Sequence, residues 1–169
     1  MRLLELFDRV LPYEVKQTSP HEFDATFAVE NIKYHVHIEL QQVYAFLNPE
    51  FYRTIGNDAA FEAEKEILDD SFRDDEIIAV EFTATTPGSR PSTDPTGTRN
   101  EFLVFSTIVN IIKEIIRKVS PKWVMCSGDS PARAKLYYRM IKTLTRSNPI
   151  AYTGGYGGDT DINLIGKLR

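Results

Sequence analysis

Two histidines stand two residues apart in a segment of alternating apolar and polar positions. His35 and His37 are interleaved with Tyr34, Val36 and Ile38, so in a β-strand both imidazoles project from the same face. Imidazole nitrogens are common zinc ligands, and a metal pair at this spacing is geometrically possible. The neighbouring sequence offers no identifiable third ligand. We therefore interpret this face as solvated and predict no metal site.

A second cluster of potential ligands is acidic. Five carboxylates surround Phe72 and Arg73: Asp69, Asp70, Asp74, Asp75 and Glu76. Divalent cations such as Ca²⁺ prefer carboxylate oxygens. The cluster lacks the glycine and the alternate spacing of a calcium-binding loop. We interpret it as a solvated surface loop.

The only cysteine, Cys126, ends the apolar run Trp123-Val124-Met125-Cys126. A single cysteine excludes an internal disulfide and a multi-cysteine metal cluster. Because free cysteine is among the most buried residue types, Cys126 is predicted to be a small core residue rather than a nucleophile.

The histidines belong to a predicted antiparallel hairpin over residues 22–41. Apolar and polar residues alternate in both arms, and Glu30-Asn31 forms the turn between them, which predicts a sheet with one face on the core. The predicted inward residues are Phe23, Ala25, Phe27, Val29, Tyr34, Val36, Ile38 and Leu40.

The second half of the chain is predicted to alternate strands and helices. Residues 77–84 read as a strand, and residues 85–97 as a long irregular loop. A helix follows from Thr98, where Glu101 completes a capping box; its apolar positions recur at helical spacing up to Pro121. The apolar positions are Phe105, Ile108, Val109, Ile111, Ile112, Ile115 and Ile116.

A strand over residues 123–126 and a second helix entered through Ser130-Pro131 come next, with proline at the first helical position. Further predicted elements are short helices over residues 2–11 and 59–68, a strand over 43–47, and terminal strands over 150–152 and 161–168. The order predicts an α+β fold with a mixed, mainly antiparallel central sheet flanked by helices on both faces. With 169 residues, 42% of them hydrophobic, we predict one domain over residues 1–169.

The composition bears on possible partners. The formal net charge is −4, which argues against broad electrostatic binding to nucleic acid or anionic membrane. No apolar run approaches the roughly 20 residues of a membrane-spanning helix, and Met1–Asp8 does not read as a secretory signal. We expect a cytoplasmic location.

The motif Thr96-Gly97 … Val104-Phe105-Ser106-Thr107-Ile108-Val109 … Ser130-x-x-Arg133-x-x-Leu136-Tyr137 resembles small proteins encoded by tailed bacteriophages. The order of elements resembles the GNAT family of N-acetyltransferases. In that family a central strand leads to a loop and helix whose amides bind the pyrophosphate of acetyl-CoA, and the next strand and helix complete the cleft. The phage resemblance covers about residues 78–145 and implies the cytoplasm of an infected host cell; a place in the virion stays open.

The GNAT resemblance implies specific roles for residues of this chain. Residues 77–84 would form the central strand, with Glu81 as the general base that deprotonates an amine. Tyr137 would be the general acid at the thioester sulfur. The cofactor-binding residues would be Gly97, Thr98, Arg99, Asn100 and Arg133.

The phosphate loop departs from the family pattern, which places small residues so that backbone amides can approach the pyrophosphate. Here only Gly97 fits, with Pro95 before it and Arg99 after it. Two hypotheses follow. The first is a non-catalytic, GNAT-like phage protein that binds a protein partner of phage or host. The alternative is a working N-acetyltransferase that uses acetyl-CoA; without it, no cofactor is expected.

Overall fold

The structure is a computed structural model that describes residues 9–42, 75–85, 87–88, 101–128, 131–145, 150–153 and 162–168. The chain divides into two compact units. Unit one comprises Met1–Glu39 and Val80–Ser120, and unit two comprises Leu40–Ala79 and Pro121–Arg169. Strands β3 and β4 run through both units.

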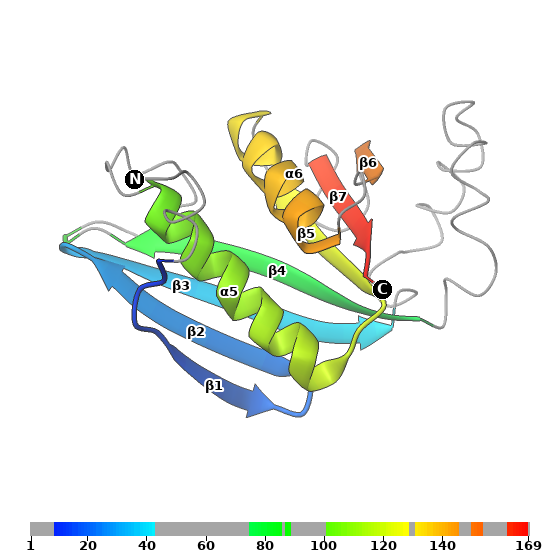
Figure 1. Cartoon of the computed structure of the whole chain (residues 1–169), viewed down its shortest axis with the longest axis horizontal. Helices are drawn as coiled ribbons and strands as arrows, with labels where there is room; N and C mark the ends of the chain where they lie inside the picture. Colours follow the sequence, from blue (N-terminus) through cyan, green and yellow to red (C-terminus); the bar gives the residue numbers. More distant parts are fainter. Residues whose placement is uncertain are drawn as a thin grey trace. The chain divides into compact units, whose positions relative to one another are not determined.

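The described helices and strands form an α+β fold (Figure 1). They are β1 (Glu14–Ser19), β2 (Glu22–Val29), β3 (Ile32–Gln42), β4 (Glu76–Thr85), α5 (Glu101–Val119), β5 (Trp123–Gly128), α6 (Pro131–Thr145), β6 (Ile150–Thr153) and β7 (Ile162–Lys167). The strand order is β1-β2-β3-β4-β5-β7-β6. Neighbours β1–β2, β2–β3, β5–β7 and β6–β7 are antiparallel. The Lys122 amide, just before β5, donates to the Glu76 carbonyl at the start of β4, so these two strands run parallel and the sheet is mixed.

The predicted hairpin is confirmed in unit one. β2 and β3 pair in register from Val29 and Ile32 at the turn to Glu22 and Glu39. Glu30 has a φ of 54°, the left-handed conformation that a tight hairpin turn requires. All eight predicted inward residues are buried, and the rings of Phe27 and Tyr34 stack at 5.0 Å. Strand β1, which pairs with β2, was not predicted.

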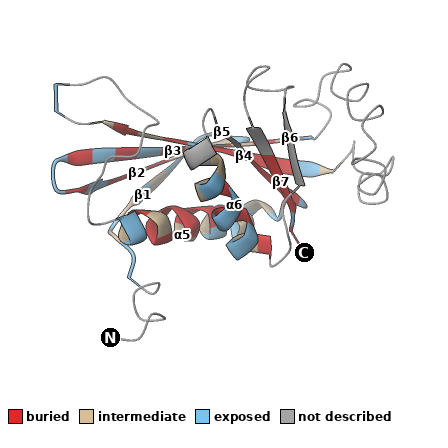
Figure 2. Ribbon diagram, turned by 90° about the horizontal axis from the view of Figure 1, so that it is seen from above, coloured by how far each residue is buried: buried red, intermediate tan, exposed pale blue. Residues whose placement is uncertain are grey.

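Helix α5 packs on unit one as the sequence predicts. Its fully buried residues, each at most 1% exposed, are Thr107, Ile108, Ile111, Ile112 and Ile115. In Figure 2 the helix lies along one side of β1, β2 and β3, and the ammonium of Lys118 lies over the Phe23 ring. The helix ends where Ser120 takes a φ of 48° and donates its amide to Ile116, a left-handed C-terminal cap.

One side of α5 carries a polar stripe formed by Ser106, Thr107, Asn110 and Glu114. The chain before β1 covers this stripe. Ser106 donates to the Arg9 carbonyl at 2.9 Å, and Thr107 Oγ1 accepts from the Leu11 amide at 3.0 Å. Tyr13 and Glu114 close the contact with a 2.8 Å hydrogen bond between their side chains. Residues 9–13 therefore run along the helix without regular structure of their own. The helix predicted over residues 2–11 is thus wrong for residues 9–11, and its residues 2–8 lie outside the described residues.

Two side chains of α5 hold Tyr13, the last residue of this segment before β1. Its hydroxyl donates to Glu114 and accepts from Asn110 Nδ2 at 3.0 Å. Partial burial, followed by the hydrogen bond to Glu114 and the negative charge of that carboxylate, raises the pKa of Tyr13. The phenol therefore stays protonated, as the bond it donates requires.

In unit two, α6 packs on β5 and β7. Tyr137, Met140 and Ile141 lie on one face of this helix and are fully buried. Gly166 of β7 allows a close approach, because a Cβ there would meet side-chain carbons of Ile141 and Thr145. Cys126 is confirmed as a core residue, and burial raises the pKa of its thiol.

Asp75 has a structural role in unit two. It accepts from Lys122 Nζ and from Trp123 Nε1, each at 2.9 Å, and its side chain is 13% exposed. The interpretation of the acidic cluster as a solvated loop is therefore wrong for this residue. Asp69, Asp70 and Asp74 lie outside the described residues, as do the elements predicted over 43–47 and 59–68.

The burial of α5 gives the first prediction. Ile112 is 0% exposed, so Ile112→Asp would place an unpaired charge in the core and lower the free energy of unfolding by more than about 4 kcal/mol. Urea denaturation followed by circular dichroism measures this. Lys113→Asp is the matched control, because Lys113 is exposed and the change there should cost less than about 1 kcal/mol. Equal stability of the two variants would refute the burial of this helix face.

Candidate functional site

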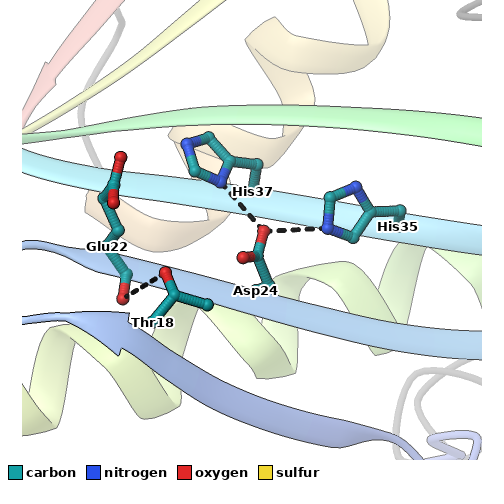
Figure 3. Close-up of polar contacts among 5 residues, drawn as sticks. All are labelled: Thr18, Glu22, Asp24, His35 and His37. Atoms are coloured by element: carbon teal, nitrogen blue, oxygen red, sulfur yellow. Dashed lines mark hydrogen bonds and ion pairs between the residues drawn. The ribbon is translucent and has the colours of Figure 1, made fainter.

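Three side chains form a polar cluster on the outer face of the β2–β3 hairpin (Figure 3). Asp24 of β2 lies directly opposite His37 of β3, and Thr26 lies opposite His35. Asp24 Oδ1 is 2.8 Å from His35 Nε2 and 2.9 Å from His37 Nδ1. One carboxylate oxygen therefore bridges both imidazoles.

The outward orientation of the histidines was predicted, but Asp24 was missed. The sequence contained the signal, because the strands pair outward from the turn residues Glu30 and Asn31. Counting along both arms from Val29 opposite Ile32 places Asp24 opposite His37, as observed. The register, rather than proximity in the sequence, identifies the third polar group.

The bridging contacts control the protonation of the cluster. Partial burial raises the pKa of Asp24, but the hydrogen bonds from His37 and His35 and their positive charge lower it by more, so the net pKa lies below the ordinary aspartate value. An ionised carboxylate only accepts hydrogen bonds. His35 Nε2 and His37 Nδ1 must therefore carry hydrogens, and in the neutral rings His35 Nδ1 and His37 Nε2 are the unprotonated nitrogens.

Other charged residues face the same side of the sheet. Lys16 of β1 pairs in register with Asp24, and its ammonium is 3.6 Å from Glu14. Glu22 and Glu39 form the next cross-strand pair on this face, two residues beyond Asp24 and His37. The side chains of His35, His37 and Asp24 are 46%, 35% and 28% exposed, so the cluster is open to solvent. Within the described ranges, no group of three or more His, Cys, Asp or Glu side chains could hold a metal ion in the conformation of this structure.

The residues implied by the GNAT resemblance fall in different parts of the structure. Glu81 is exposed on β4 in unit one. Tyr137 lies on α6 in unit two and is 0% exposed. Arg133 belongs to the first turn of α6, while the loop residues lie outside the described residues: Gly97, Thr98, Arg99 and Asn100.

Comparisons with known proteins leave the family open. No protein-family model matches the chain, and no curated protein sequence matches it. Among the helices that the structure describes, none is long and apolar enough to cross a membrane.

The lowered pKa of Asp24 gives the second prediction. The ionised carboxylate stabilises the fold at a pH above the aspartate pKa of the unfolded chain, about 4. This contribution should disappear as the pH falls through the lower pKa of the folded state. Asp24→Asn should therefore reduce the free energy of unfolding by roughly 1 kcal/mol near neutral pH, and by much less at about pH 2.5.

Urea denaturation of both proteins across the acid range measures this difference. Glu14→Gln is the control, since it removes a carboxylate from an exposed ion pair, which contributes little. A difference between Asp24→Asn and the parent that is independent of pH would show that the carboxylate charge is not what stabilises the cluster.

Proposed function

We propose that this chain is a phage-type protein with a GNAT-like scaffold, helices on both faces of its sheet, and a function in binding a protein partner. The scaffold proposal is supported by the order β4, α5, β5 and α6. That order matches the strand, helix, strand and helix around the acetyl-CoA cleft in the GNAT family. A shared scaffold does not by itself carry the chemistry, because unrelated functions recur on one fold.

The observation that favours binding over catalysis is the burial of Tyr137. A general acid must come within hydrogen-bonding distance of the sulfur that it protonates. Tyr137 is 0% exposed, so in this conformation an external thioester has no access to its hydroxyl. The sequence of the phosphate loop agrees with this, since proline at position 95 removes an amide donor that an anion site would use.

The alternative is acetyl-CoA-dependent transfer of an acetyl group to an amine, and one observation favours it. Glu81 is exposed on β4, the strand that precedes α5, where a carboxylate could accept a proton from the attacking amine. Backbone amides would then stabilise the oxyanion of the tetrahedral intermediate. In this mechanism Arg99 or Arg133 would provide charge-assisted contacts to the cofactor phosphates.

Titration calorimetry with acetyl-CoA decides between the two functions and is the third prediction. We expect no binding heat up to millimolar acetyl-CoA, and no added hydrogen-exchange protection across residues 85–100, because three prolines in that loop remove amide donors. Micromolar binding would overturn the proposal. If Glu81→Gln then abolished acetyl transfer while leaving acetyl-CoA affinity unchanged, the enzyme function would replace it.

A further inference from the structure

We propose that Asp24, His35 and His37 bind one divalent transition-metal ion of the zinc type on the outer face of the β2–β3 hairpin. This site is independent of the proposed partner binding and of acetyl-CoA. Its basis is the contact between all three side chains: both ring nitrogens lie within hydrogen-bonding distance of the same carboxylate oxygen.

The donor set suits such an ion. Two imidazole nitrogens and one carboxylate oxygen form a set that Zn²⁺ takes in sites with three protein ligands, where water holds the fourth position. Calcium and magnesium prefer oxygen ligands throughout, so these histidines select against both ions. On binding, each neutral ring would move its hydrogen to its other nitrogen, and a protonated ring would release one proton to water, because a coordinating imidazole nitrogen must be deprotonated.

The geometry requires a small rearrangement. Ligand atoms about 2.1 Å from a tetrahedral zinc ion lie about 3.4 Å from one another, whereas the two nitrogen–oxygen distances here are 2.8 and 2.9 Å. The histidine ring centroids are 6.5 Å apart, and two rings on one ion would bring them to about 5 Å. The cluster is thus not a preformed site, and no group among the described residues could hold a metal ion in the present conformation. Side-chain rotations that bring the two rings about 1.5 Å closer together would form the site.

The backbone beneath the cluster is well ordered by packing. Asp24 and His37 occupy directly paired positions, and the residues on either side of them, Phe23, Ala25, Val36 and Ile38, are at most 3% exposed. The strands therefore fix the three Cβ positions, so metal binding needs to order only side-chain torsions. Glu22 and Glu39, the next pair on this face, favour a cation, whereas Lys16 opposite Asp24 opposes one.

Zinc titration calorimetry on untagged full-length protein tests the site and is the fourth prediction. We expect one equivalent of Zn²⁺ to bind, and His37→Ala or Asp24→Asn to weaken that binding by at least about tenfold. The chain provides its own control, since its third histidine, His21, is exposed outside the cluster. His21→Ala should leave the zinc affinity unchanged within about twofold.

Nuclear magnetic resonance gives a measurement that needs no variant. Zinc should shift the ring resonances of His35 and His37 and leave those of His21 in place, while Co²⁺ should give the visible absorption of a four-coordinate ion. The absence of binding at millimolar zinc would overturn the proposal. So would equal zinc affinity of the parent and a folded His37→Ala variant, or loss of binding in His21→Ala.

Discussion

The packing of α5 against the inner face of the β2–β3 hairpin is the interaction on which unit one depends. The fully buried isoleucines of the helix and the alternating apolar residues of the strands supply this interface. Because strand side chains alternate between faces, burying one set commits every intervening side chain to the opposite face. The outward position of Asp24, His35 and His37 is therefore a consequence of the core.

The same helix also explains the course of the chain before β1. The polar stripe of α5 would need water as its hydrogen-bonding partner if it faced solvent. It consists of Ser106, Thr107, Asn110 and Glu114. Hydrogen bonds between this stripe and residues 9–13 instead hold that segment in place. Buried polar groups must find partners, and here residues 9–13 supply them without forming regular structure. In unit two, Asp75 fulfils the same requirement for the indole N–H of Trp123.

The functional proposals rest on different kinds of observation. The preference for partner binding over catalysis rests on the burial of Tyr137. Tyr137 became a candidate general acid only through the resemblance to the GNAT family. The metal site rests on contacts between three side chains and requires no resemblance. The proposed metal site therefore does not depend on whether the chain catalyses acyl transfer.

Local sequence patterns were enough to predict the hairpin with its inward residues, the long buried helix, the buried cysteine and the second helix. They also predicted a strand over residues 77–84, which the structure shows as Glu76–Thr85. These features depend on local periodicity, capping and turn chemistry, which act over a few residues. β1 was missed because its residues are mostly exposed, so it lacks an apolar alternation and is held by pairing with β2. The folded structure was needed to show that residues 9–13 cover the polar stripe of α5, that Asp75 is anchored by Lys122 and Trp123, and that Asp24 bridges two histidines. Each of these depends on contacts between residues distant in sequence, whose hydrogen-bonding partners and solvent access are set when the elements pack together.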